Sequence, residues 1–303
     1  MAGNGEGTGY ILRALGANFA IACAKGVGAF VTGSGAMLAE TLHSLSDCVN
    51  QLLLLLGLRQ ARRPPSEQYP LGQGRNLYFW SFMVAMLLFL GGGTYSIYEG
   101  IHKLQHPSPL ESPHIAIGIL AFALVVEGWA MAGAYKAVNA RKGDRSLIQY
   151  LRETKDSDLV VIFGEDGAAV LGLALALIAI VVAWVTGNPM FDAIGTLCIG
   201  TVLIAVAIFL AAEVKSLLLG EAADPRLVAE ITAAAGEDQR IIKVLRALTV
   251  QQGPGEVMVA CKLQFVDKLG TQELVASINA FEQRLQAKVP EVKWCFIEPD
   301  ISD

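Results

Sequence analysis

Charged residues are scarce in this chain, and their scarcity excludes several classes of protein. Only 17% of the 303 residues are charged, whereas 53% are hydrophobic and the mean hydropathy is +0.48. Soluble enzymes carry a larger charged fraction, so a membrane protein is the first expectation. The formal net charge is −5 and no face or tail gathers enough Lys and Arg to follow a phosphate backbone, which excludes nucleic acid as a partner.

Paired cysteines and a basic leader are also absent. The five cysteines include no C-x-x-C pair, which argues against a thiolate zinc site and against a disulfide framework. The opening segment "MAGNGEGTGY" lacks the basic flank of a cleaved signal peptide. We therefore expect the first apolar segment to be retained as a membrane span.

Long apolar runs take the place of charge. A helix needs about 20 residues to cross about 30 Å of hydrocarbon. Six segments reach that length and predict an α-helical polytopic membrane protein with six transmembrane helices, at about Tyr10 to Val31, Ala36 to Leu58, Leu77 to Ile101, His114 to Tyr135, Leu159 to Val185 and Pro189 to Leu219.

The connecting loops predict how the chain is oriented. Basic residues gather in the loops after the second and fourth segments, whereas the turns "VTGSGA" and "TGNPMFD" have none. Because cytoplasmic loops carry the excess of Lys and Arg, both termini are expected in the cytoplasm. A bacterial inner membrane is favoured over an organelle membrane as the host of this multi-pass protein.

The chain changes character after Leu219. Residues 1–219 are expected to form the transmembrane domain and residues 220–303 a cytoplasmic α/β domain of the ferredoxin-like kind. The order predicted is a helix from Pro225 with Asp224 as N-cap, strands over 243–252 and 256–266, a helix capped by Thr271, and a strand over 292–299. A domain of about 80 residues often depends on dimerisation, so a homodimer is expected.

The second apolar segment carries a stripe of polar residues. Glu40, His43, Asp47 and Asn50 are separated by 3, 4 and 3 positions, so their side chains share one helix face. An ionisable group within a span costs about 2.5–3.5 kcal/mol on insertion scales, and it therefore faces a protein interior or a watery cavity. Hydrogen bonding to a neighbouring helix is the structural alternative to a functional site.

A second polar cluster lies in the fifth segment, where Glu165 and Asp166 interrupt "SDLVVIFGEDGAAVLG". Counted from the cytoplasmic edges at Leu58 and Asp158, Asp47 lies about 16 Å deep and Asp166 about 12 Å deep, so the two groups are expected to meet. One imidazole and two or three carboxylates suit a tetrahedral Zn²⁺ site, and the lack of thiolates leaves Mn²⁺, Fe²⁺ and Co²⁺ open.

The sequence resembles the cation diffusion facilitator family of proton-coupled divalent-metal exporters over nearly its whole length. "HSLSD" resembles that family's His/Asp-x-x-x-Asp motif, which implies that His43 and Asp47 are metal ligands. "ETLHSLSDCVNQ" and "VVIFGEDGAAVLG" are most similar to the branch that includes the mitochondrial zinc exporter. The resemblance implies six spans, a cytoplasmic α/β tail and metal–proton antiport.

Several positions depart from the family pattern. The family's fifth span carries His-x-x-x-Asp, whereas Asp166 here has Ile162 four residues before it and Val170 four after it, which leaves Glu165 as the substitute ligand. The loop "SEQYPLGQGR" lacks the second metal site of bacterial relatives, and the tail has no histidine. We therefore expect dimerisation without bridging zinc.

Further residues are assigned by the same resemblance or left open. Arg75 and Glu221 match a charge pair that holds the halves of a family dimer together, and Asp192 and Asn18 match polar positions along the pathway. Lys25 is expected to pair structurally with another span, whereas the role of Glu127 stays open. Three outer-loop histidines are either solvated or collect and release metal: His102, His106 and His114.

The predicted function is efflux of a divalent cation, Zn²⁺ above all, in exchange for protons by alternating access. Metal ligands must be deprotonated, so proton and metal compete for the same groups. The metal is cargo and no cofactor is expected. The alternatives are export of Mn²⁺, Fe²⁺ or Co²⁺, a metal-dependent membrane enzyme, disfavoured because H-E-x-x-H is absent, and a metal sensor, disfavoured by the histidine-free tail.

Overall fold

The computed structural model describes residues 4–154 and 157–302. The chain divides into two compact units. The first contains Met1–Leu56, Trp80–Tyr150 and Asp158–Glu213, and the second contains Gly57–Phe79, Leu151–Ser157 and Val214–Asp303. Each unit is described by itself.

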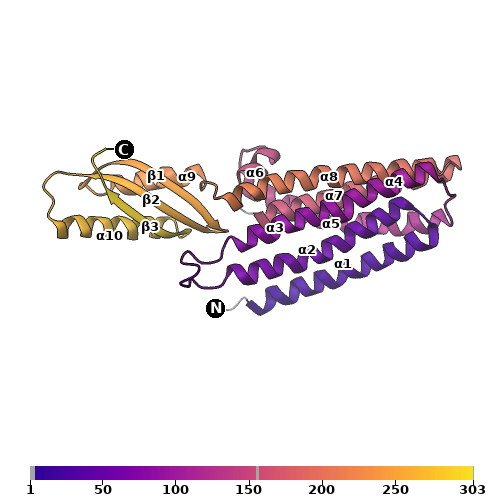
Figure 1. The fold of residues 1–303 in the computed structure, drawn as a ribbon, viewed down its shortest axis with the longest axis horizontal. Helices are drawn as coiled ribbons and strands as arrows, with labels where there is room; N and C mark the ends of the chain where they lie inside the picture. Colours follow the sequence, from indigo (N-terminus) through magenta and orange to yellow (C-terminus); the bar gives the residue numbers. More distant parts are fainter. Residues whose placement is uncertain (1–3, 155–156, 303) are drawn as a thin grey trace. The chain divides into compact units, whose positions relative to one another are not determined.

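Long helices form the first unit and run alongside one another (Figure 1). Each segment expected to span the membrane is helical. The short helix α6 (Leu147–Glu153) is absent from the prediction, because it does not lie within a long apolar run. The long helices are α1 (Asn4–Thr32), α2 (Gly35–Ala61), α3 (Asn76–Leu87), which continues through the π-helical segment η1 (Leu88–Thr94) into α4 (Tyr95–Gln105), α5 (Pro113–Lys142), α7 (Ser157–Thr186) and α8 (Met190–Leu219).

Four helical segments of the described chain are long and apolar enough to cross a membrane: Asn76–Gln105, Pro113–Lys142, Leu159–Thr186 and Met190–Leu219. The described part of α1 contributes a shorter apolar stretch, Asn18–Thr32. The polar stripe of α2 lowers the hydropathy of that helix. Helix length and composition are thus those of a membrane protein, and the count of six spans stays a prediction.

Glycines bring α8 close to the η1–α4 segment. A β-carbon on Gly200 would lie 2.9 Å from the backbone nitrogen of Ile97 and 3.0 Å from the carbonyl oxygen of Gly93. Real β-carbons rarely come that close to backbone, so only glycine fits at this position. Small residues allow such close backbone approach between membrane helices. Gly93 contributes to the same close approach, since a β-carbon there would lie 3.2 Å from the backbone nitrogen of Ile204.

The second unit contains a three-stranded sheet with the order β1–β2–β3. Strands β1 (Ile241–Gly253) and β2 (Glu256–Phe265) pair antiparallel around the predicted "GPG" turn, and β2 pairs parallel with β3 (Val292–Pro299). Helices α9 (Pro225–Gly236) and α10 (Thr271–Lys288) contact β1 and β3 respectively. The element order α, β, β, α, β is confirmed.

One face of this sheet forms the core of the unit. Alternate residues of β2 point inward, which gives the half-buried strand pattern that the sequence predicted. They pack with α9 and α10 in one buried cluster that includes Leu227, Ile231, Val257, Val259, Cys261, Leu263, Phe281 and Leu285. Burial raises the pKa of Cys261 to about 12, so this thiol stays protonated and behaves as an apolar filler.

The helix caps in this unit agree with the sequence at one position and correct it at another. Asp224 caps α9, since its Oδ1 accepts a hydrogen bond from the backbone N–H of Arg226 at 2.9 Å. Thr271 is not the N-cap of α10. The N-cap is Gly270, whose N–H donates to Glu273 Oε2 at 3.0 Å. A glutamate at this position satisfies the orphan N–H itself, so the threonine is free to start the helix.

Candidate metal site

The polar stripe of α2 faces the interior of the helical bundle. Glu40, His43 and Asn50 are fully buried, and the side chain of Asp47 is 15% exposed. Apolar residues on the rest of α2, such as Leu45 and Leu52, are exposed on the bundle surface, which suits a lipid-facing side. The one-face arrangement that the 3, 4, 3 spacing predicts is therefore present.

Glu40 is neutralised by a lysine from another helix. The Lys25 ammonium on α1 lies 3.3 Å from Glu40 Oε2 and donates a hydrogen bond to Ser44 Oγ at 2.6 Å. Both partners of the ion pair are completely buried. Glu40 Oε1 lies against Gly172 of α7, where a β-carbon would overlap it. The expected structural pairing of Lys25 is confirmed, and three helices meet at this carboxylate.

Asn50 at the other end of the stripe contacts α7. Its Nδ2 donates a hydrogen bond to Glu165 Oε1 at 2.5 Å, and both side chains are buried. The amide thus holds the Glu165 carboxylate at the level of the stripe. The second and fifth predicted spans therefore meet here, as the depth argument required.

His43 and Asp47 lie between Glu40 and Asn50 on the stripe, and all four side chains have at least one polar atom without a hydrogen-bond partner among the described residues. Neither ring nitrogen of His43 has a hydrogen-bond partner, and Asp47 Oδ1 has none. His43 Nε2 lies 3.7 Å from Asp47 Oδ2, which is too far for a hydrogen bond. A buried polar atom without a partner costs about 1–3 kcal/mol, so its retention calls for an explanation. Imidazole nitrogen and carboxylate oxygen are the donors that Zn²⁺ accepts.

Two more carboxylates interact electrostatically with this pair, but they do not complete a set of metal ligands around it. Asp166 interacts electrostatically with Asp47, and Glu127 on α5 interacts with His43, Asp47 and Asp166. Among residues 4–154 and 157–302, no three His, Cys, Asp or Glu side chains come close enough to hold a metal ion together. The assignment of Glu165 and Asp166 as ligands stays a prediction.

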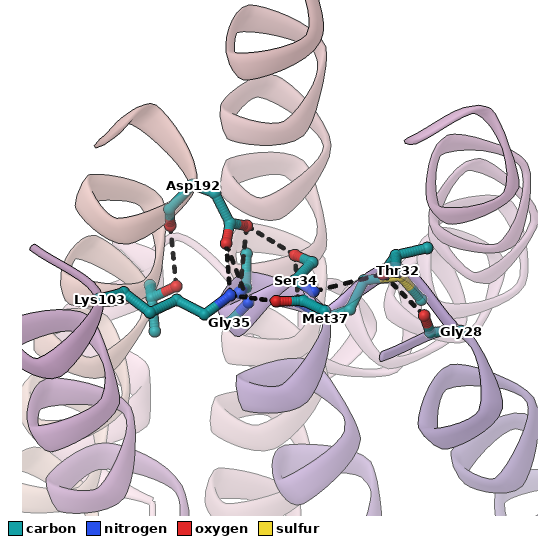
Figure 2. Close-up of polar contacts among 10 residues, drawn as sticks. Gly28, Thr32, Ser34, Gly35, Met37, Lys103 and Asp192 are labelled. Carbon is teal, nitrogen blue, oxygen red and sulfur yellow. Dashed lines mark hydrogen bonds and ion pairs between the residues drawn. The ribbon is translucent and has the colours of Figure 1, made fainter. Parts of the chain in front are cut away.

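Asp192 lies at a different level of the bundle, where it binds the start of α2 (Figure 2). It accepts hydrogen bonds from Ser34 Oγ at 2.6 Å and from the backbone N–H of Gly35 at 2.9 Å, and it pairs with Lys103 at 3.1 Å. A carboxylate at a helix N-terminus satisfies free N–H groups and the helix dipole. His43 comes eight residues after Gly35, or about 12 Å along the helix, so Asp192 is not a neighbour of His43 and Asp47.

The other residues singled out from the sequence lie apart from this pair. Asn18 is half-buried in α1. In the second unit, the Arg75 guanidinium lies against Gly220, where a β-carbon would be 3.0 Å from Arg75 Nη2. Gly220 has a φ of +98° and directly precedes Glu221. Arg75 therefore reaches the segment that contains Glu221, and the charge pair itself stays a prediction.

Sequence reasoning left the role of Glu127 open and did not find the Lys103–Asp192 pair. For Glu127, the sequence shows only an isolated acidic residue within an apolar span. The Lys103–Asp192 pair could be predicted only if it were known that the turn at residues 33–34, the end of α4 and the start of α8 lie at one end of the bundle. No local pattern in the sequence contains that information.

A bundle of long apolar helices with His and Asp side chains at helical spacing in its interior is typical of membrane proteins that handle cations. The comparison with known families agrees: residues 11–219 match the cation efflux transmembrane domain. The chain belongs to the cation efflux family, also called the cation diffusion facilitators.

Known relatives extend the match into the second unit. The chain is 34% identical over 264 residues to "Proton-coupled zinc antiporter SLC30A9, mitochondrial" of Homo sapiens, which covers 86% of this chain and 46% of that protein. It is 29% identical over 264 residues to "Metal tolerance protein C4" of Arabidopsis thaliana, with 86% and 58% covered. It is 23% identical over 269 residues to "Magnetosome protein MamB" of Magnetospirillum gryphiswaldense, with 89% and 85% covered. The chain spans about half the length of the human relative.

Proposed function

We propose that the protein exports a divalent cation, Zn²⁺ above all, in exchange for protons. The observation that carries the proposal is the pair formed by His43, which is fully buried, and Asp47, which is 15% exposed: the ring nitrogens and Oδ1 of this pair have no hydrogen-bond partner in the described chain. Their neighbours on the same helix face, Glu40 and Asn50, each have one side-chain atom engaged by another helix, whereas Glu40 Oε1 and Asn50 Oδ1 have no partner in the described chain. The groups left over are of the types that bind Zn²⁺. The printed name of the human relative, a proton-coupled zinc antiporter, supports the same cargo and coupling.

The proposed ligand set adds Glu165 and Asp166 from α7 to His43 and Asp47. Asn50 orients Glu165, and Glu127 lends negative charge from α5. A bound cation would replace the missing hydrogen-bond partners of the α2 pair. Protons compete for these groups, because imidazole and carboxylate bind metal only when deprotonated. A gradient of protons can thereby drive the movement of metal.

The wider arrangement belongs to the same proposal. Six spans carry the site, both termini face the cytoplasm, and the ferredoxin-like unit after residue 219 dimerises. Exposed apolar residues on the sheet face opposite to the core support that dimer, namely Leu248 at 50% and Phe296 at 55% exposure. Alternating access follows from rigid movement of helices around a fixed site. For the host membrane we propose a bacterial inner membrane, although relatives include both mitochondrial and bacterial proteins.

The test is uptake of Zn²⁺ and Mn²⁺ into sealed proteoliposomes with an imposed pH gradient. Asp47→Ala and Asp166→Ala should abolish gradient-driven uptake. Asp144→Ala, which removes an exposed carboxylate after α5, is the matched control and should transport normally. If Asp47→Ala transports like the native protein, the stripe is structural packing and the proposal is wrong. If only Asp166→Ala is active, α7 contributes through Glu165 or not at all.

The same assay separates the transporter from the other classes. A transporter moves metal with no further substrate or partner, whereas a metal-dependent enzyme or a sensor does not. The ratio of Zn²⁺ to Mn²⁺ uptake then measures how permissive the site is. A site made of one imidazole and several carboxylates is expected to accept more than one borderline cation.

A further inference from the structure

A pair of exposed imidazoles lies at the end of α4, apart from the site described above. His102 and His106 are four residues apart, so they share one helix face. Their ring centroids are 5.1 Å apart with an interplanar angle of 31°. The ring of Tyr98, one turn earlier, stacks on His102 with centroids 6.3 Å apart and an angle of 18°. The three rings form a continuous row on the outside of the bundle.

The separation of the two imidazoles matches that of two ligands on one metal ion. Zinc binds imidazole nitrogens at about 2.0 Å in a tetrahedral arrangement, and this places the centroids of two rings on the same ion about 5 Å apart. His102 and His106 have this separation already. The separation of the two rings is therefore compatible with a shared ion, which requires each side chain to turn one ring nitrogen towards it.

Charge near the pair does not oppose a cation. The ammonium of Lys103 pairs with Asp192 Oδ2 at 3.1 Å (Figure 2) and donates a hydrogen bond to the carbonyl of Gly33. Its positive charge is compensated by a buried carboxylate. Compensation of the adjacent lysine leaves the histidine face free to accept a divalent ion.

The position of the pair places it in water or among lipid headgroups. The helical segment Asn76–Gln105 has 30 residues, or about 45 Å at a rise of about 1.5 Å per residue, which exceeds the hydrocarbon thickness of about 30 Å. His102 and His106 occupy the last turn and the first residue beyond it. Both side chains are exposed. Metal can therefore reach them from the aqueous phase.

We propose that His102 and His106 form a second metal site, a two-histidine surface site that takes Zn²⁺ or a similar borderline divalent cation. No third His, Cys, Asp or Glu in the described chain joins the pair within reach of one ion, so water completes the coordination and the ion exchanges readily. The site lies at the same end of the bundle as the Asp192 cluster. That this end is the release side rests on the proposed function; the binding of metal there does not.

The test is calorimetric titration of Zn²⁺ into the full-length protein in nanodiscs, prepared without a polyhistidine tag. We expect a class of zinc binding that survives Asp47→Ala. His102→Ala and His106→Ala should each weaken that class at least tenfold, since one imidazole alone cannot chelate. The matched control is His114→Ala, which removes an exposed histidine from the first turn of α5 and should leave zinc binding unchanged.

The proposal is overturned if the double variant His102→Ala/His106→Ala binds as many zinc ions with the same affinities as the native protein. It is also overturned if each single substitution has no more effect than His114→Ala. If Asp47→Ala does not fold, the native background decides, because the double variant should then lose one bound zinc ion and keep the others. Failure of the transport proposal is distinguishable, since it appears as normal uptake by Asp47→Ala whatever the histidine variants bind.

Discussion

Replacing Lys25 with methionine is expected to destabilise the protein by about 3–5 kcal/mol, because breaking a buried ion pair leaves the other charge uncompensated. Lys25 and Glu40 are fully buried, and Glu40 Oε1 already lacks a hydrogen-bond partner. In Lys25→Met the whole carboxylate would depend on neighbours that include the bare backbone of Gly172. Methionine has a similar length and apolar stem, so packing changes little.

The double variant Lys25→Met/Glu40→Gln separates charge from packing. Replacing both partners removes the uncompensated charge, and such replacements of buried pairs are often nearly neutral. The double variant should therefore be more stable than Lys25→Met alone, with a coupling free energy of at least about 2 kcal/mol. Lys136→Met, which removes an exposed lysine from α5, is the control and should stay within about 0.5 kcal/mol of the native protein.

The measurement is thermal unfolding of the full-length protein in nanodiscs, followed by loss of helical circular dichroism. A loss of about 3 kcal/mol lowers the midpoint by roughly 6–12 °C in a unit of about 200 residues. If the effects of Lys25→Met and Glu40→Gln simply add in the double variant, the two side chains do not interact and the reasoning is wrong. Zinc uptake by a stable double variant would then show whether the pair also serves transport.

Three further outcomes are expected. Gly172→Val should lower stability and zinc uptake, because the valine side chain would overlap the Glu40 carboxylate. Gly118→Val is the control and should change neither property, because a β-carbon there meets no neighbour within 4 Å. Equal unfolding midpoints of the two variants would contradict the close approach of Glu40 to Gly172. Asp192→Asn should cost about 1–3 kcal/mol in thermal unfolding, because it removes the charge at the start of α2, and an unchanged midpoint would speak against that role. A hydrogen bond from Arg240 holds the pKa of Asp238 below its ordinary value. The stability that the ionised Asp238 carboxylate contributes is therefore present at neutral pH and declines as the pH falls below about 4. Hydrogen exchange of the second unit should show this decline, and its persistence in Asp238→Asn would refute the assignment.

Much of the fold follows from patterns that are visible within a short stretch of sequence, namely the length of an apolar run and the period of its alternation. A run of about 20 apolar residues is helical because membrane or bundle interiors offer no other partner for the backbone. Alternation in "EVMVACKLQFV" identifies a half-buried strand, and β2 occupies Glu256–Phe265 with Val257, Val259 and Cys261 inward. These features depend on neighbours in sequence, so the sequence contains them.

Helix ends are less determined, and errors there affect estimates of depth. The sequence places the cytoplasmic edge of the second span at Leu58, whereas α2 continues to Ala61. Three residues change a depth estimate by about 4.5 Å. The contact between Asn50 and Glu165 nevertheless agrees with the predicted meeting of the two spans, because both depths were counted from the same side.

Partners across helices could not be read from the sequence. The spacing on α2 shows which residues share a face, yet it does not show which helix that face meets. That Lys25 pairs with Glu40, and Asn50 with Glu165, depends on the rotation and axial offset of α1 and α7. Those are set by packing details such as Gly172, where only a residue without a β-carbon admits the Glu40 carboxylate.

The division of the α2 stripe also bears on how the metal is chosen. Because Glu40 is held by Lys25, adding its charge to the ligand set would first require breaking a buried ion pair. The amide nitrogen of Asn50 is engaged by Glu165, whereas its Oδ1 has no partner among the described residues. In the proposed site, the choice among cations is therefore expected to depend mainly on the imidazole of His43 beside the carboxylate of Asp47. The imidazole favours zinc over hard cations such as Mg²⁺, and replacing it with Asp should shift uptake from Zn²⁺ towards Mn²⁺.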